Sequence, residues 1–171
     1  YILDSKGQAL RSLKKYKEAI KLYEEKYKLS KNEDDRLWIG ICLDILGNIE
    51  DNTVEKQKYY QEAIKIYDLI LEITQDDAFV WYNKAISLTS IKKYKEAKKN
   101  ILKAIEMNPN KDIFWDQLGK ISSDEGNYQQ AIICYDKSLK IVTSEVILHK
   151  KANALYNLEK YEKAIDCYDK A

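Results

Sequence analysis

Glycine and proline are scarce in this sequence, which holds five glycines and one proline among 171 residues. Folds made of many short strands need such residues at frequent turns, so the scarcity argues against a β-sandwich, a β-barrel or a loop-rich fold. Charged residues make up 33% of the chain and hydrophobic residues 45%. This balance is typical of amphipathic helices rather than of disorder, and it predicts an all-α protein.

Neither sign of charge is in excess, because 29 lysines and arginines face 28 aspartates and glutamates. Nucleic-acid-binding modules usually carry a clear basic excess, so a nucleic acid is not the expected partner. The three cysteines, Cys42, Cys134 and Cys167, form no C-x-x-C pair. Their odd number and their spacing offer neither a disulfide framework nor a zinc site, and they predict reduced thiols packed as small apolar groups.

Long hydrophobic runs are also missing, since the longest one, from Leu37 to Leu43, is ended by Asp44. A membrane-spanning helix needs about 20 apolar residues, so this run predicts a buried helix and the chain is expected to have no membrane span. The sequence begins with Tyr1 rather than methionine. We therefore expect a piece of a longer protein, whose full-length form could carry an upstream targeting segment. The expected location is the cytoplasm.

A short motif recurs at an interval close to 34 residues. The pattern Tyr-x-x-Ala-Ile-x-x-Tyr begins at Tyr16, Tyr60, Tyr128 and Tyr161, and a weaker copy begins at Tyr94. Its apolar residues follow the spacing i, i+3, i+4, i+7, which defines one face of an α-helix. The alanine one turn after the tyrosine is small enough for two helices to approach closely.

A second apolar stripe lies upstream of each motif. It combines a large residue with a small one four positions later, as in Trp81 with Ala85 and Trp115 with Gly119. Each repeat is therefore predicted to be two antiparallel helices joined by a short turn. Gly126 tolerates the left-handed conformation that such a turn needs at the end of a helix.

These stripes make the chain resemble the tetratricopeptide repeat (TPR) family. The residues that carry the resemblance are Trp81, Ala85, Leu88, Tyr94, Ala97, Ala104, Pro109, Trp115, Leu118, Gly119, Tyr128, Ala131 and Tyr135. It covers essentially the whole chain and implies an all-α fold, a right-handed α-solenoid of antiparallel helix pairs (a TPR superhelix). The chain departs from the family pattern at Ser122 and Ser138, and proline closes only one repeat.

We expect a single TPR array over residues 1–171. The approximate repeats are 1–33, 34–77, 78–111, 112–144 and a truncated 145–171.

The second repeat is irregular and leaves two registers open for its first helix. Trp38 can serve as the first-helix aromatic, whereas Gly40 and Gly47 suit a register two residues earlier. Either register implies an inserted or extended segment between the helices, near residues 48–56. Asn52, followed three residues later by a glutamate, predicts a longer second helix from about residue 53. The extension is either a neutral lengthening or a projection that contacts a partner.

In the TPR family the first helices line a concave face on which ligands usually bind, so the resemblance implies a peptide-binding groove. A stripe rotated by about 100° from the packing stripe supplies its candidate residues. They are Phe79, Tyr82, Ile86, Asp116, Lys120, His149, Asn153 and Tyr156. An apolar centre with polar flanks suits an extended or helical peptide.

The alternative is that Tyr82 and Ile86 pack against adjacent helices, while Asp116 and Lys120 form an ordinary surface pair. One ligand class is disfavoured. TPR modules that bind the carboxylate tails of heat-shock chaperones use a first-helix lysine, and that place holds Asp4, Tyr82, Asp116 and His149 here.

Catalytic and metal-binding patterns are weak. His149 is the only histidine, and no nucleophile motif accompanies it. The acidic pairs Asp34-Asp35 and Asp76-Asp77 are expected to precede helix starts and to cap them rather than to bind metal. We therefore expect a protein that is not an enzyme and that uses no cofactor.

Two interpretations of function remain. The first is a scaffold that binds a peptide or protein segment in its concave groove. The second is an interior spacer or self-association segment of a longer TPR protein, because no polar capping helix follows the last repeat and its end could associate with another copy. The lysine-rich segment 92–103 is either a solvated convex face or a site for an acidic partner or an RNA backbone.

Overall fold

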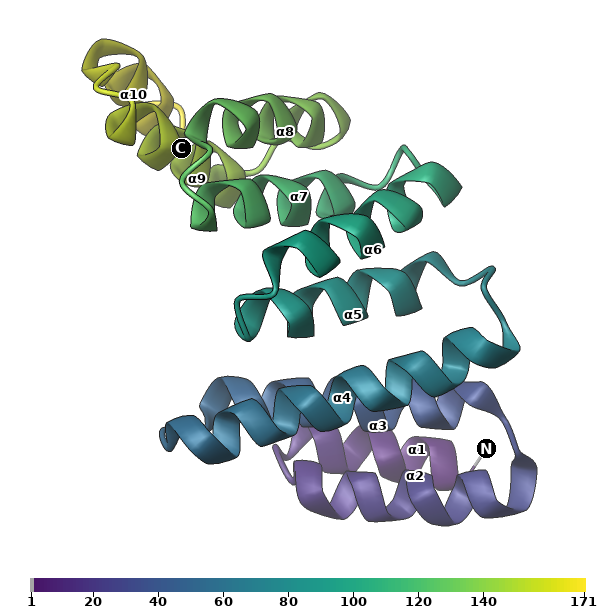
Figure 1. Ribbon diagram of the computed structural model, residues 1–171. Helices are drawn as coiled ribbons and strands as arrows, with labels where there is room; N and C mark the ends of the chain where they lie inside the picture. Colours follow the sequence, from purple (N-terminus) through teal and green to yellow (C-terminus); the bar gives the residue numbers. More distant parts are fainter. Residues whose placement is uncertain (1) are drawn as a thin grey trace. The chain divides into compact units, whose positions relative to one another are not determined.

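The computed structural model describes residues 2–171, and within this range every regular element is an α-helix (Figure 1). The helices are α1 (Ile2–Ser12), α2 (Tyr16–Ser30), α3 (Glu33–Ile49), α4 (Thr53–Ile73), α5 (Ala78–Ser90), α6 (Tyr94–Met107), α7 (Asp112–Asp124), α8 (Tyr128–Ile141), α9 (Glu145–Asn157) and α10 (Tyr161–Tyr168). The prediction of an all-α chain of helix pairs is confirmed.

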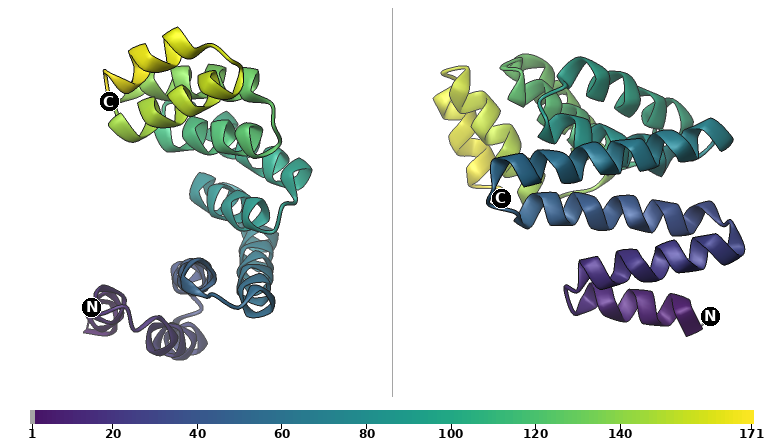
Figure 2. Two further views of the ribbon diagram at one scale, coloured as in Figure 1. Left: turned by 90° about the vertical axis from the view of Figure 1, so that its left-hand side faces the viewer. Right: turned by 60° about the horizontal axis from the view of Figure 1, so that its bottom comes forward.

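The chain divides between α5 and α6 into an N-terminal unit that ends at Lys93 and a C-terminal unit that begins at Tyr94. In the N-terminal unit each helix from α1 to α5 contacts the next, and α3 also contacts α5. Figure 2 shows α3 and α4 side by side along most of their lengths. In the C-terminal unit α6 contacts α7, and α7 to α10 contact one another in chain order. Within each unit, successive helices therefore bury their apolar faces against one another, as in other repeat proteins.

The core of each unit mixes tyrosine rings with small residues. In the N-terminal unit Tyr23 and Tyr67 are buried with Ala19, Cys42 and Ala63. In the C-terminal unit the buried cluster combines residues of α8, α9 and α10, namely Ala131, Ile132, Tyr135, Ile147, Ala152, Ala154, Leu155, Ala164 and Cys167. A large ring beside a small side chain lets neighbouring helices pack closely without leaving a gap.

The closest approach between paired helices occurs where a tyrosine ring packs on a glycine. A Cβ added at Gly7 would lie 2.6 Å from the hydroxyl oxygen of Tyr23, and one at Gly119 would lie 2.5 Å from Cε1 of Tyr135. Glycine and tyrosine are sixteen residues apart in both repeats. Only a residue without a side chain leaves room for the ring at this depth.

The same contact settles the register of the second repeat. A Cβ at Gly40 would lie 2.6 Å from Cε1 of Tyr67, so Gly40 is the equivalent of Gly119 and Trp38 is not the first-helix aromatic. Gly40 and Tyr67 are 27 residues apart, which is 11 more than in the regular repeats. Because an α-helix has 3.6 residues per turn, the insertion adds close to three turns, and they are divided between α3 and α4.

The added turns repeat the packing pattern rather than form a loop. Gly47 lies two turns after Gly40, and a Cβ there would lie 2.9 Å from Cε1 of Tyr60, whose hydroxyl donates to Asn48 at 2.9 Å. The helix α4 is 21 residues long and begins at Thr53, where the Asn52 side chain accepts hydrogen bonds from two backbone amides. The start of the second helix agrees with the prediction from the capping pattern.

Caps and turns follow local chemistry, with one correction. Asp77 caps α5 by accepting from the amides of Phe79 and Val80. We expected Asp34 and Asp35 to precede α3 and to cap it. The cap is instead Asn32, and both aspartates lie inside the first turn of the helix. Gly126 has a φ of +80°, the left-handed conformation predicted for the turn between α7 and α8.

Replacing Gly119 with alanine is expected to lower the free energy of unfolding. The new methyl group would press on the buried ring of Tyr135, and overpacking of this kind costs about 1–3 kcal/mol. Because the ring is buried and Cε1 would lie 2.5 Å from the added Cβ, we expect the upper part of this range, about 2–3 kcal/mol. The better helix propensity of alanine returns about 1 kcal/mol, so the net loss measured by chemical denaturation should be about 1–2 kcal/mol.

A double variant, Gly119→Ala with Tyr135→Ile, provides the control. It copies the pair Ala85 and Ile101, which lies sixteen residues apart one repeat earlier. It should recover stability relative to Gly119→Ala, because the ring that clashes is gone. An unfolding midpoint of Gly119→Ala equal to that of the parent protein would contradict the described close approach.

Candidate functional site

The aromatic and aliphatic candidates of the third repeat share one face of α5. Phe79 is 43% exposed, and Tyr82 and Ile86 are half-buried on the same face one and two turns later. The residue that caps this helix, Asp77, adjoins them. The face therefore combines apolar surface that water still reaches with a carboxylate at its start.

The register of α3 places a second set of residues in the equivalent positions. Since Gly40 corresponds to Ala85, the counterparts of Phe79, Tyr82 and Ile86 on α3 are Asp34, Leu37 and Ile41. Sequence reasoning missed these three residues because it left the register open. The sequence signal that indicates the correct register is the pair Gly40 and Gly47, which packs against Tyr67 and Tyr60 of α4.

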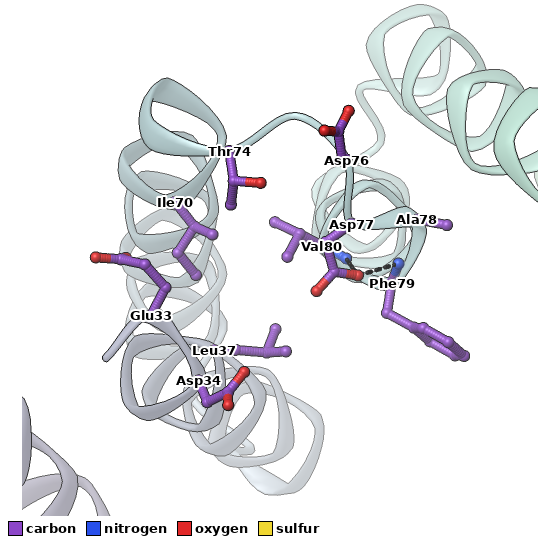
Figure 3. Close-up of a pocket in the computed structure, with 10 residues that line it drawn as sticks. All are labelled: Glu33, Asp34, Leu37, Ile70, Thr74, Asp76, Asp77, Ala78, Phe79 and Val80. Atoms are coloured by element: carbon purple, nitrogen blue, oxygen red, sulfur yellow. Dashed lines mark hydrogen bonds between the residues drawn. The ribbon is translucent and has the colours of Figure 1, made fainter. Parts of the chain in front are cut away.

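Between these faces the structure has a cavity of about 410 Å³, which we call the α3–α5 cavity (Figure 3). Its lining comes from the start of α3, the end of α4 and the start of α5: Glu33, Asp34, Leu37, Ile70, Thr74, Asp76, Asp77, Ala78, Phe79 and Val80. Figure 3 shows the side chains of Leu37, Ile70 and Val80 converging from the three helices. Apolar groups thus form the floor, and the carboxylates of Asp34 and Asp77 lie beside it.

A second cavity of about 310 Å³, the α1–α3 cavity, adjoins the first. It is lined by Asp4, Lys26, Asn32, Asp34, Asp35, Leu37 and Trp38. Asp34 and Leu37 line both cavities. The hollow surface therefore continues across the three first helices of the N-terminal unit.

Ion pairs hold the helices beneath the α1–α3 cavity together. The buried carboxylate of Asp35 accepts from Lys26 at 2.7 Å and from the hydroxyl of Ser30 at 2.9 Å. Lys26 also pairs with Asp4 and so connects α1, α2 and α3. The hydrogen bond to Asp35 has the largest effect on the pKa of Lys26 and raises it, and the hydrogen bond to Asp4 raises it further. The same bond with Lys26 lowers the pKa of Asp4.

A second buried carboxyl joins the other helices of the N-terminal unit. Asp44 of α3 accepts from the hydroxyl of Tyr67 on α4 at 2.7 Å and from that of Ser87 on α5 at 2.5 Å. Burial raises the pKa of Asp44 to about 7, and the two hydrogen bonds oppose this shift. The contact between first helices in this unit therefore depends on a group that titrates near neutral pH.

In the C-terminal unit the polar candidates lie on α7 and α9. Asp116 accepts from Lys150 of α9 at 2.7 and 2.8 Å. The expected alternative, a surface pair between Asp116 and Lys120, is therefore wrong. Lys120 is exposed. Burial raises the pKa of Asp124, and the charge of Lys120 opposes part of this shift.

The candidates of α9 contact tyrosines of α10. The ring of His149 lies edge-on to that of Tyr168 with centroids 5.5 Å apart, and the Tyr168 hydroxyl donates to Asn153 at 2.5 Å. Tyr156 and Tyr161 make a similar contact at 5.3 Å. All three candidates on α9, His149, Asn153 and Tyr156, are exposed. The structure thus combines the predicted residues with two tyrosines that sequence reasoning did not select.

The lysine-rich segment is partly neutralised within its own unit. Lys98 pairs with Glu125, and Lys103 pairs with Glu106 at 2.8 Å. Lys95 and Lys99 are exposed.

Reactive groups are not assembled in the described part of the chain. All three cysteines are free and buried, which confirms the expected role as small packed groups, and burial raises the pKa of Cys42 to about 11. Residues 2–171 contain no cluster of histidine, cysteine or carboxylate side chains suited to a metal ion. None of the described helices has the length and apolar character needed to cross a membrane.

Comparison with known families assigns the fold to a class. Models of the tetratricopeptide repeat family match residues 80–111, 114–141 and 146–171, and a further model of that description matches residues 2–37. The chain belongs to the tetratricopeptide repeat family, as its repeated motifs predicted. Repeat arrays of this kind provide extended surfaces for binding other proteins.

A curated relative is the TPR repeat-containing protein MJ1428 of Methanocaldococcus jannaschii, which is 27% identical over 165 residues. The match covers 92% of this chain but 29% of that protein. Among solved structures, MamA from Desulfovibrio magneticus RS-1 is similar with a TM-score of 0.82 and 17% identity, over 99% of this chain and 90% of that one. The thermophilic TPR protein TTC0263 from Thermus thermophilus has a TM-score of 0.76 and 16% identity, over 96% and 86%. These similarities support the fold.

The buried carboxyl predicts a pH dependence of stability. Because the pKa of Asp44 is raised from 3.8 to about 7 on folding, the unfolded chain ionises first as the pH rises. Stability is therefore lost between about pH 4 and pH 7, by up to about 4 kcal/mol at about 1.4 kcal/mol per pKa unit. Asp44→Asn removes the charge and keeps one of the two acceptor oxygens. Its stability relative to the parent should therefore rise with pH over this range.

Urea unfolding of both proteins at several pH values measures the difference, in which the titrations of all other groups cancel. Asp51→Asn, a change at an exposed loop carboxylate, should leave the difference from the parent constant with pH. A constant difference for Asp44→Asn as well would show that Asp44 does not titrate as described.

Proposed function

We propose that this chain is a non-enzymatic scaffold that binds a peptide or protein segment along its first helices. The observation that carries the proposal is the partly exposed face of Phe79, Tyr82 and Ile86 beside the α3–α5 cavity. A bound segment would cover apolar surface that water now reaches, and burial of aromatic side chains dominates the energetics of such contacts.

The shape of the hollow surface favours a chain segment over a compact small molecule. Two cavities meet at Asp34 and Leu37, so an occupant of both would be elongated. Backbone amides and carbonyls of an extended segment can be matched by side chains such as Asp34 and Asn32 at the rim, while its side chains enter the cavities.

The C-terminal unit would contribute polar and aromatic contacts of its own. Asp116 and Lys120 of α7 and His149, Asn153 and Tyr156 of α9 are the proposed contact residues there. What supports them is that Lys120 and the α9 residues are exposed and that Asp116 is fixed by Lys150.

The proposal predicts that the double variant Tyr82→Ala with Ile86→Ala weakens binding of a captured partner segment at least about tenfold, because truncation of central anchors costs about 1–2 kcal/mol or more. Partners would first be captured with the parent protein, and the affinity of a purified partner would then be measured by calorimetry. Circular dichroism would verify that the variant remains helical.

A matched control is Leu69→Ala with Ile73→Ala, which removes two exposed apolar side chains from α4 in the same unit. This control should bind as the parent does. Equal affinities of the parent and the Tyr82/Ile86 variant would eliminate this face as the binding site.

A second candidate function is self-association through α10. Tyr161, Ile165 and Tyr168 form one face of this helix and are 51%, 58% and 37% exposed. On α8 the matching Ile132 and Tyr135 are 8% and 2% exposed, because α9 packs there. A second copy of the chain could cover the α10 face in the way that α9 covers α8.

If the α10 face associates, sedimentation of the parent protein should show a dimer whose fraction rises with concentration. Ile165→Glu should be monomeric, since a charge would be buried without a partner. Val146→Glu, at an exposed position of α9, should dimerise as the parent does. A parent protein that stays monomeric at millimolar concentration would exclude this function.

A further inference from the structure

We propose that the groove of the N-terminal unit selects a cationic peptide segment, with lysine or arginine on both sides of an apolar residue. The inference rests on the proposed function and adds the chemical class of the ligand. It follows from the charges that line the α3–α5 cavity, from the absence of a lysine or arginine paired with Asp34 or Asp76 within residues 2–171, and from the apolar floor of the cavity.

The charge of the cavity lining is one-sided. Four of its ten residues are acidic, namely Glu33, Asp34, Asp76 and Asp77, and none is a lysine or arginine. The chain as a whole carries a net charge of +1, so the acidic residues are concentrated here rather than spread evenly. Carboxylates around a hollow, low-dielectric surface reinforce one another's potential and attract a cation.

Interactions within the protein account for only part of this charge. Glu33 is paired with Arg36 at 3.2 Å, and Asp77 is used to cap α5. Among residues 2–171, neither Asp34 nor Asp76 pairs with a lysine or an arginine. Capping does not explain Asp76, which precedes the cap of α5 and is exposed. Two carboxylates are thus available to a ligand, and Asp77 can share its second oxygen.

The apolar floor of the cavity favours a ligand that has an apolar group between its cationic groups. Ile70 and Val80 are buried at its base, and Leu37 is half-buried beside them. In Figure 3 the carboxylates of Asp34 and Asp77 lie beside this apolar centre, while those of Glu33 and Asp76 point away from it. In an extended peptide, residues two apart lie on the same side and about 7 Å from each other. A central aliphatic side chain can therefore enter the cavity while flanking basic residues reach the carboxylates.

The neighbouring cavity distinguishes a peptide from a bound metal ion. It continues the hollow surface past Asp34 towards Asp4, where Lys26 already offsets the charge of Asp4 and Asp35. The uncompensated charge is therefore centred on the α3–α5 cavity, and the hollow extends beyond it. The described residues hold no cluster suited to a metal ion. An elongated, partly apolar cation fits both cavities.

The first experiment identifies the preferred ligand class without assuming it. A displayed library of random dodecapeptides would be selected on the parent protein and, in parallel, on Tyr82→Ala with Ile86→Ala. We expect enriched peptides with an excess of lysine and arginine around a leucine, isoleucine or phenylalanine. Neutral or acidic peptides that still need Tyr82 and Ile86 would overturn the cationic class and leave the proposed function intact. No enrichment on the parent would overturn both.

The second experiment measures one probe, the fluorescein-labelled nonapeptide Gly-Lys-Arg-Gly-Leu-Gly-Lys-Arg-Gly, by fluorescence anisotropy. Replacing its basic residues with glutamate, or its leucine with serine, should weaken binding at least about tenfold. Raising NaCl from about 50 to about 500 mM should weaken it by a similar factor, because salt screens exposed charges.

The protein variant Asp34→Asn with Asp76→Asn and Asp77→Asn should weaken binding of the nonapeptide about tenfold or more. Asparagine caps helices as well as aspartate does, so α5 should remain folded. Asp51→Asn, at an exposed carboxylate outside the cavities, is the matched control and should change nothing. Binding that survives the triple change, or that falls equally in the control, would overturn the proposal.

Discussion

The structure depends on the contact between a tyrosine ring and a bare stretch of helix backbone. Tyr23, Tyr67 and Tyr135 each pack on a glycine of the preceding helix at a depth where a Cβ would not fit. The size of one small residue thus decides how far the opposite ring enters, and with it how closely the two helices of a repeat can pair.

Much of the fold could be predicted because the interactions that determine it are local and repeated. Tyr-x-x-Ala-Ile-x-x-Tyr defines one helix face, and Asn52 and Gly126 mark where helices start and stop. The register of α3 could not be decided, because Trp38 and Gly40 both match the family pattern and only the contact with Tyr67 distinguishes them. The ion pair of Asp116 with Lys150 joins residues 34 positions apart, so no short-range pattern could have replaced the expected partner Lys120.

The candidate site was predictable in part for the same reason. Helical spacing places Phe79, Tyr82 and Ile86 on one helix face, and the family resemblance marked that face as a candidate groove, but the cavity beside them is formed equally by α3 and α4. Asp76 and Asp77 looked like capping residues in the sequence, and Asp77 is one. Only the structure shows that Asp76 lines the same cavity as Asp34 and the apolar floor. The cavity is therefore formed by residues of neighbouring repeats, whereas each helix pair is formed by the residues of a single repeat.

The lengthened hairpin of α3 and α4 shows how this architecture can grow. Gly47 lies seven residues after Gly40 on α3, and Tyr60 lies seven residues before Tyr67 on α4. Seven residues are close to two helical turns, so the inward faces stay in phase and Gly47 meets Tyr60 as Gly40 meets Tyr67. A spacing of about five or six residues, close to one and a half turns, would instead place the second glycine on the side facing away from α4. Such a hairpin is therefore lengthened in both helices together, and each added stretch carries its own contact between a glycine and a tyrosine.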